Sequence, residues 1–170
     1  YNGTTFNLSE FNNLPKGTTG NFKLTREAGT MEFTGKFEGD QGMGKYKFVG
    51  DKQYGSAMNK ELNETLSERD LMVFFYIDIK LSYAKMLKSE GYKDLDKDKI
   101  IPLAALKVDA AYIKSLKESG LKGLDLDQMI PLKSLNIDKK YIQEIRNAGY
   151  ADITSDQLIA FKAQGIDGAY

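Results

Sequence analysis

The 170-residue chain contains no cysteine and no histidine. Without cysteine it cannot form a disulfide, a thiolate nucleophile or a zinc–sulfur site. Without histidine it lacks imidazole metal ligands, Ser-His-Asp chemistry and the commonest general base. The remaining Asp, Glu, Lys, Tyr and Ser residues show no spacing that places a nucleophile beside a base. We therefore expect no catalytic residue, no metal site and no cofactor, and we predict that the protein is not an enzyme.

The sequence also lacks a long apolar run and an excess of charge of either sign. The longest apolar run, residues 71–77, is far shorter than the ~18 residues of a membrane span and is typical of a buried helix. Equal numbers of basic and acidic residues, 24 of each, give a formal net charge of zero. No global field then favours nucleic acid or anionic lipid. We expect no nucleic-acid partner and no membrane insertion within this chain.

Residues 1–53 have the alternating pattern of half-buried β-strands, as in Phe22-Lys23-Leu24. The predicted strands are 4–8, 21–27, 30–38 and 45–49. Turns are expected at 27–29 and 40–44, where glycine tolerates unusual backbone angles. The pattern predicts an antiparallel β meander with one apolar face. So small a sheet cannot bury that face alone, so we expect it to pack on the first helices or to continue a β region upstream.

Residues 54–170 carry an internal period of 29 residues, which is the signature of a repeat architecture. The aligned rows include Tyr83, Tyr112, Tyr141 and Tyr170; Gly91, Gly120 and Gly149; Leu103, Leu132 and Phe161; Val108, Ile137 and Ile166; and Asp109, Asp138 and Asp167. They predict four helical hairpins, 54–82, 83–111, 112–140 and 141–169, stacked as a small α-solenoid. The expected fold class is α+β, a small N-terminal meander followed by a helical repeat array.

The ends of the first helix in each unit follow from capping chemistry. Asp109 and Asp138 are predicted N-caps, because a carboxylate there can accept the free N–H groups of the first turn. Val108 and Ile113 have the spacing of a hydrophobic staple. Gly120 is expected to end the helix in the left-handed C′ conformation, and the next residue should return to the last turn.

The second helix of each unit is expected to start near Asp96, Asp125 and Thr154 and to end at Lys107, Asn136 and Gly165. Asp125 and Thr154 each have capping-box spacing to a glutamine. Pro102 and Pro131 lie inside this stretch, where proline lacks the backbone donor. The helix either starts later, at Asp98 and Asp127, or kinks, and both alternatives stay open.

The first unit, 54–82, is degenerate. Leu62 stands where the glycine is expected, and Lys80 stands where the aspartate is expected. Terminal repeats are often atypical because they face something other than a neighbour. We expect this one to face the β-sheet.

Residues 141–150, Tyr-Ile-Gln-Glu-Ile-Arg-Asn-Ala-Gly-Tyr, continue as Ala-Asp-Ile-Thr in 151–154. This segment resembles tandem helical repeats of bacterial envelope and signalling proteins, among them the extracytoplasmic tails of beta-lactam-sensor-type antirepressor metallopeptidases. The resemblance covers about residues 83–170, and the meander is similar to such tails as well. The His-Glu-x-x-His helix of the peptidase itself is absent. The resemblance implies a sensing or docking appendage in the periplasm or cell envelope of a bacterium.

Several groups of residues can be explained by a structural role as well as by a functional one. Segment 94–98, Asp-Leu-Asp-Lys-Asp, mimics the start of a calcium loop, but Lys99 and Ala105 stand where the loop needs glycine and glutamate, so calcium is not expected. A row of basic residues near helix C-termini is favoured by the helix dipole. A tyrosine row can pack between units or form a ligand platform. The candidate partner surface comprises Tyr92, Tyr112, Tyr141, Tyr150, Lys88, Lys117 and Arg146.

The expected function is a non-catalytic protein-interaction or sensory appendage that docks a protein partner through the helical-repeat surface. The alternatives are a small-ligand or glycan-binding sensor using exposed tyrosines and, third, a nucleic-acid binder. Because the chain starts at Tyr1 and residues 167–170 open a further unit, we expect it to be a fragment of a longer protein.

Overall fold

The computed structural model describes residues 6–11, 14–38, 41–121 and 123–168. Its contacts divide the chain into two compact units, Tyr1–Ser82 and Tyr83–Tyr170. A three-stranded antiparallel sheet is followed by helices, so the predicted α+β class is confirmed. The composition changes near residue 53, whereas the units divide after Ser82, because the degenerate first repeat belongs to the same compact unit as the sheet.

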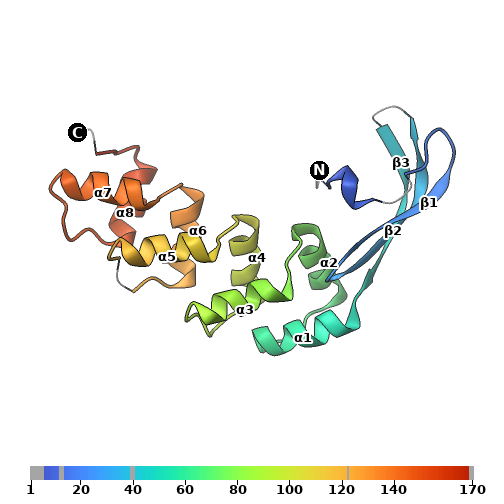
Figure 1. Ribbon diagram of the computed structural model, residues 1–170, viewed down its shortest axis with the longest axis horizontal. Coiled ribbons are helices and arrows are strands. Elements are labelled where there is room, and N and C mark those ends of the chain that lie inside the picture. Colours follow the sequence, from blue (N-terminus) through green and yellow to red (C-terminus); the bar gives the residue numbers. More distant parts are fainter. Residues whose placement is uncertain (1–5, 12–13, 39–40, 122, 169–170) are drawn as a thin grey trace. The chain divides into compact units, whose positions relative to one another are not determined.

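The N-terminal unit is a β meander with two helices (Figure 1). The strand order is β1-β2-β3, with every neighbouring pair antiparallel. The elements are the 3-10 helix η1 (Leu8–Glu10), strands β1 (Gly20–Arg26), β2 (Gly29–Glu38) and β3 (Gln41–Gly50), and helices α1 (Lys52–Leu62) and α2 (Glu68–Ile77).

Two predictions about these strands were wrong. Of the expected strand 4–8, residues 4 and 5 lie outside the described residues, and Leu8 opens η1 because the Asn7 side chain forms a capping box with Glu10. The glycine-rich segment expected as a turn, 40–44, is strand from Gln41 onward. Gly42 and Gly44 pair across the ladder with Phe37 and Gly35 instead of turning the chain.

The apolar face of the sheet is covered only in part by helix α2. Leu24 and Met31 are fully buried at the end of the sheet nearest to α2. There the Phe48 and Phe75 rings meet with centroids 5.4 Å apart, and α2 contacts both β2 and β3. The expectation that the meander packs on the first helices is therefore confirmed at this end of the sheet.

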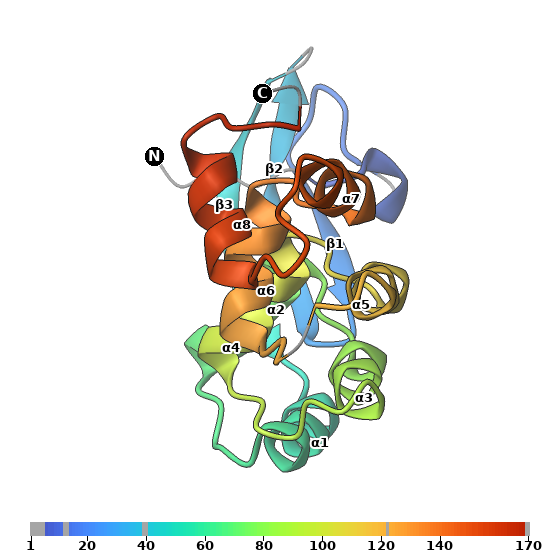
Figure 2. The ribbon, with the colours of Figure 1, turned by 90° about the vertical axis from the view of Figure 1, so that its left-hand side faces the viewer.

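The C-terminal unit stacks helical hairpins in two rows. In Figure 2, α4, α6 and α8 follow one another in one row and α3, α5 and α7 in the other, and contacts join α4 to α6 and α6 to α8. The helices are α3 (Leu81–Ser89), α4 (Lys97–Ala105), α5 (Ala110–Glu118), α6 (Leu126–Ser134), α7 (Lys139–Asn147) and α8 (Ser155–Ala163). Leucine and isoleucine side chains from successive hairpins form one continuous core.

The predicted helix ends are largely confirmed. The Asp109 carboxylate accepts from the Tyr112 amide at 2.7 Å, and Asp138 accepts from Tyr141 at 2.8 Å. Gly91, Gly120 and Gly149 have positive φ after the first helices. Positive φ also occurs after the second helices, at Lys107, Asn136 and Gly165. Left-handed residues therefore end both helices of a unit.

The prolines do not delay the second helices. Helix α4 is capped at Asp96 and α6 at Asp125, so Pro102 and Pro131 lie inside helices that start at the earlier of the two predicted sites. Downstream the helix continues, since the Leu106 amide donates to the Pro102 carbonyl at 2.9 Å. The capping box forms at Thr154. At Asp125 only half of it forms: the Asp125 carboxylate accepts from the Gln128 amide, but the Gln128 Oε1 accepts no bond in return. The Gln128 Nε2 donates to Asp156 at 3.3 Å.

The degenerate repeat keeps the same construction with different residues. Asp51 caps α1 through the Tyr54 amide at 2.7 Å. It belongs to the Asp109 row, two periods before Asp109, and lies just before the predicted start of the unit at residue 54. Helix α1 ends at Asn63, which takes the left-handed conformation in place of the missing glycine. The Glu27 carboxylate accepts from the Leu81 amide at 2.9 Å, where the aspartate cap is replaced by Lys80.

Candidate functional site

The tyrosines that recur every 29 residues form hydrogen bonds within the repeat array. Each hydroxyl donates to the carbonyl 25 residues later: Tyr83 to Val108 at 2.8 Å, Tyr112 to Ile137 at 2.8 Å and Tyr141 to Ile166 at 2.7 Å. Burial raises the pKa of the Tyr83, Tyr112 and Tyr141 phenols. Of the predicted partner surface, Tyr112 and Tyr141 therefore act as internal clamps.

Lys88, Lys117 and Arg146 form the basic row, and the last two donate hydrogen bonds to the preceding repeat. The Lys117 ammonium donates to the carbonyl and the carboxylate of Glu90, both at 2.8 Å. The Arg146 guanidinium donates to the Ser119 carbonyl, which is the equivalent position one unit later. Lys88 lies half-buried in the last turn of α3. Lys117 and Arg146 therefore satisfy carbonyls at helix ends, where the dipole favours cations.

Tyr92 and Tyr150 are the remaining predicted tyrosines. Tyr92 lies beside Lys117, whose Nζ is 5.6 Å from the ring centroid, and it lines a cavity of about 220 Å³ with Lys99 and Asp127. Tyr150 is 53% exposed and meets the Phe161 ring edge-on. The structure thus brings Tyr92 and Lys117 together and leaves Tyr150 separate.

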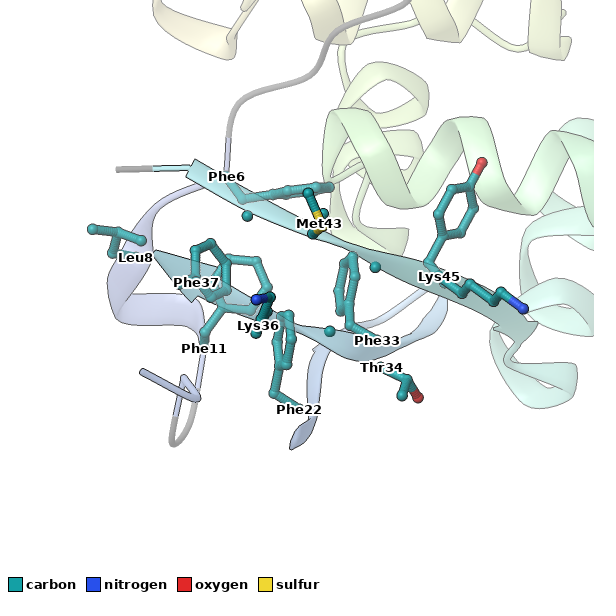
Figure 3. Close-up of a pocket in the computed structure, with 14 residues that line it drawn as sticks. Phe6, Leu8, Phe11, Phe22, Phe33, Thr34, Lys36, Phe37, Met43 and Lys45 are labelled. Atoms are coloured by element: carbon teal, nitrogen blue, oxygen red, sulfur yellow. The ribbon is translucent and has the colours of Figure 1, made fainter. Parts of the chain in front are cut away.

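A larger hollow lies on the meander, where the sequence did not place a site. It has a volume of about 400 Å³ and lies over the part of the sheet beyond α2, whose residues Phe75 and Tyr76 contact the lining residue Phe6. Figure 3 shows phenylalanine side chains from the N-terminal segment and from the strands around it. We call this hollow the aromatic groove; its lining includes Phe6, Leu8, Phe11, Phe22, Phe33, Phe37, Gly42, Met43, Gly44 and Tyr46.

The walls of the aromatic groove are rings in mutual contact. Phe22 and Phe33, paired across β1 and β2, stack with centroids 4.9 Å apart and an interplanar angle of 5°. Phe11 meets both rings edge-on, at 6.0 and 5.8 Å. Such offset and edge contacts stabilise rings beyond their buried area. These ring contacts therefore stabilise the wall of the groove.

Glycines form the floor of the groove next to β3. A Cβ added at Gly42 would lie 2.7 Å from the Phe37 ring, and one at Gly44 would collide with the Thr34 carbonyl oxygen. Gly44 pairs directly with Gly35 across the ladder. Only glycine fits these positions without movement of a neighbour, and the absence of side chains leaves the floor open.

Arg26 fastens the N-terminal segment to the sheet. Its guanidinium forms two hydrogen bonds with Glu10, at 2.8 and 2.9 Å, and donates to the carbonyls of Phe75 and Tyr76 at the end of α2. It also lies 5.2 Å from the Phe6 ring centroid. The hydrogen bond from Arg26 holds the pKa of the Glu10 carboxyl below its ordinary value. This ion pair fixes the segment that supplies one side of the groove.

Sequence reasoning missed this site for two identifiable reasons. The apolar face of Phe22, Phe33 and Phe37 was expected, but it was expected to pack on the first helices or to continue a β region upstream. Gly42 and Gly44 were assigned to a turn. Their period of two, with Met43 and Lys45 between and after them, is the signal that could have placed them on one face of a strand.

Comparisons with family models, curated proteins and solved structures find no match to this chain. The resemblance to antirepressor tails therefore stays a prediction. In the part of the chain that the structure describes, no helix is both long and apolar enough to cross a membrane. Among the same residues, no three Asp or Glu side chains are grouped so that they could hold a metal ion.

Proposed function

We propose that this chain is a non-catalytic protein-interaction module whose binding site is the aromatic groove of its N-terminal unit. The observation that carries the proposal is an open, apolar groove of about 400 Å³ walled by stacked phenylalanines. Exposed apolar patches of this kind mark sites of interaction, because leaving them in water has a free-energy cost. Leu8 and Tyr46, at 70% and 62% exposure, extend the apolar surface beyond the hollow.

The repeat surface supports docking less well than the groove does. Tyr112, Tyr141, Lys117 and Arg146 all make intramolecular hydrogen bonds that a partner would have to replace. The helical array then acts as a support, and the sensory role implied by the family resemblance remains part of the proposal.

A small-ligand or glycan sensor is the second candidate, and Tyr92 favours it. Its ring is half-buried in the 220 Å³ cavity together with charged and polar groups that could orient a ligand. That volume is below the ~300 Å³ at which ligand pockets commonly begin, so the groove remains the better supported site.

The test is selection of binding peptides from a displayed library against the full chain, followed by fluorescence anisotropy on variants. Leu8→Glu and Tyr46→Glu place a charge at the rim of the groove while changing exposed side chains. We expect each to weaken binding by about tenfold, equivalent to ~1.4 kcal/mol. Val49→Glu is the matched control, because Val49 is a 43% exposed apolar residue of β3 outside the groove lining.

The variants also separate the two candidates. Binders that ignore Leu8→Glu and Tyr46→Glu but are lost on Tyr150→Ala or Tyr92→Ala would place recognition on the repeats and reject the groove. Binders equally sensitive to Val49→Glu would indicate a charge effect and not contact in the groove.

A further inference from the structure

We propose, resting on the proposed function, that the groove receives an extended peptide segment of a partner protein that pairs with the outer edge of β3 and alternates apolar with acidic side chains. Addition of a strand to a sheet edge is a general mode of peptide recognition, in which main-chain bonds give affinity and alternate side chains give specificity. Three observations point to this occupant.

The first observation is which N–H and C=O groups of β3 point away from β2. The Asp51 amide donates to the Ala28 carbonyl at 3.0 Å, which continues the β2–β3 register by one pair. In an antiparallel ladder bonded and non-bonded pairs alternate, so residues 43, 45, 47 and 49 bond to β2. The N–H and C=O groups of Gly42, Gly44 and Tyr46 therefore point outward. No strand among the described residues pairs with that edge.

The Gly17 amide supports the same assignment from the other side of the sheet. It donates to the Phe37 carbonyl at 2.9 Å, on the side of β2 away from β3. Phe37 is thus in a non-bonded pair with Gly42, and the backbone groups of Gly42 face away from β2. The two hydrogen bonds, at opposite ends of the ladder, give one consistent alternation.

The second observation is what lies beside each backbone position. A residue that pairs with Gly44 would place its side chain on the same face as Gly44, which is the groove face. Glycines at 42 and 44 leave that space empty, and Phe33 and Phe37 stand behind it. The groove therefore accepts the apolar residues of an added strand, at every second position.

The third observation is charge. The other face of β3 presents Lys45 and Lys47, both exposed, and neither forms an ion pair with a described residue. Residues of the added strand that lie between the apolar ones would lie beside these cations, where acidic side chains are favoured. A second copy of this chain would bring the same lysines together at the edge, and like charges directly opposite are destabilising.

The test uses the full chain and synthetic peptides of about eight residues, a common strand length. The probe alternates valine with glutamate. Its controls are the same peptide with lysine for glutamate and a peptide of identical composition with the valines in one block. We expect the probe to bind in the groove and to slow amide exchange at Gly42, Gly44 and Tyr46. The amides of Met43 and Lys45, already bonded to β2, should change little.

A matched pair of protein variants tests the edge. Lys23, on β1, and Lys47, on β3, both pair directly with Glu32. Lys47→Glu and Lys23→Glu therefore introduce the same local repulsion, but only the first changes the β3 edge. We expect Lys47→Glu to weaken probe binding by about fivefold and Lys23→Glu by less than about twofold.

Each of the other outcomes would overturn a defined part of the inference or of the proposed function. If the block peptide or the lysine peptide binds the groove as well as the probe does, the strand-pairing inference is wrong while the groove remains a binding site. If the probe responds to Lys23→Glu instead, the added strand lies on β1. If none of these peptides binds but library-selected binders remain sensitive to Leu8→Glu, the inference fails and the proposed function stands. Loss of all groove binding rejects both.

Discussion

The hydroxyl of Tyr112 donates to the carbonyl of Ile137 at 2.8 Å, and the Ile137 amide donates to the Leu132 carbonyl at 2.9 Å. Ile137 is the residue before the Asp138 cap of α7. The tyrosine in the first turn of one hairpin therefore holds the junction with the next. Tyr54 and Ile79 repeat the arrangement at 2.5 Å, so the clamp extends into the degenerate first repeat.

Removal of one clamp hydroxyl should lower stability measurably. We expect Tyr112→Phe to reduce the free energy of unfolding by about 1 kcal/mol, because a part-buried hydrogen bond is lost and the ring is kept. Urea unfolding followed by circular dichroism measures the change. Tyr150→Phe is the control, since that ring is 53% exposed, and we expect a change below ~0.5 kcal/mol. An unchanged midpoint for Tyr112→Phe would show that the clamp does not stabilise the fold.

The same phenols predict a loss of stability in alkaline solution. Burial raises the pKa of Tyr83 and Tyr112, whereas a tyrosine in the unfolded chain titrates near ~10. Below that pH both states hold the proton and the contribution to stability is complete. As the pH rises above ~10 the unfolded state loses the proton first, so stability falls until the folded phenols ionise.

Urea midpoints measured at several pH values between about 8 and 11 test this dependence. Tyr112→Phe is the control: it should show a smaller decline than the parent chain, because one of the shifted phenols is gone. Equal slopes for the two proteins would assign the alkaline loss to other groups, such as lysines.

The repeats could be predicted from sequence because their determinants are local. Asp109 caps a helix by accepting from the amide three residues later, and Gly120 follows the end of the same helix, so the 29-residue spacing carries both ends. The clamp partner of Tyr112 could not be predicted, because the carbonyl of Ile137 is a backbone group that leaves no trace in residue type. Asn63 and Lys107 show a further limit, since non-glycine residues take left-handed positions once packing fixes the turn.

The groove escaped prediction because its residues are distant in sequence and ambiguous in type. The Phe11 ring meets the Phe22 ring, and the neighbouring Glu10 is bonded to Arg26, which also donates to the carbonyl of Phe75, 49 residues away. Gly42 suits a turn and a close backbone approach equally well. A pattern of alternation predicts which face of a strand is apolar, but it does not predict how much of that face a helix will cover.

Two substitutions at residues with left-handed backbone conformation should change the free energy of unfolding in opposite directions. Gly120 has φ of 77°, and the space around its Cα is open enough for a side chain, so Gly120→Val tests backbone conformation and not collision. We expect a loss of more than ~1 kcal/mol. Lys107 has φ of 56°, and Lys107→Gly should stabilise the chain by up to about 1 kcal/mol. Thermal and urea unfolding measure both, and the same sign for both changes would contradict the C-cap assignment.

Arg26 gives the sharpest test of how the groove is held. Its side chain is 10% exposed and satisfies Glu10 and two carbonyls at the end of α2. Arg26→Met keeps much of the length and apolar stem but leaves these acceptors unpaired, so we expect a loss of about 3 kcal/mol in the N-terminal unit. Lys36→Met is the control, because its ion pair with Glu38 is exposed and should contribute less than ~1 kcal/mol.

A double-mutant cycle with Glu10→Gln separates the ion pair from the carbonyl contacts. If Arg26 acts mainly through Glu10, the two substitutions together should cost much less than the sum of their separate effects. Amide exchange then shows where stability is lost. We expect faster exchange in η1 and β1, which carry Glu10 and Arg26, with little change in α5 to α8. Uniform loss across both units would mean that Arg26 stabilises the whole chain and does not specifically hold the wall of the groove.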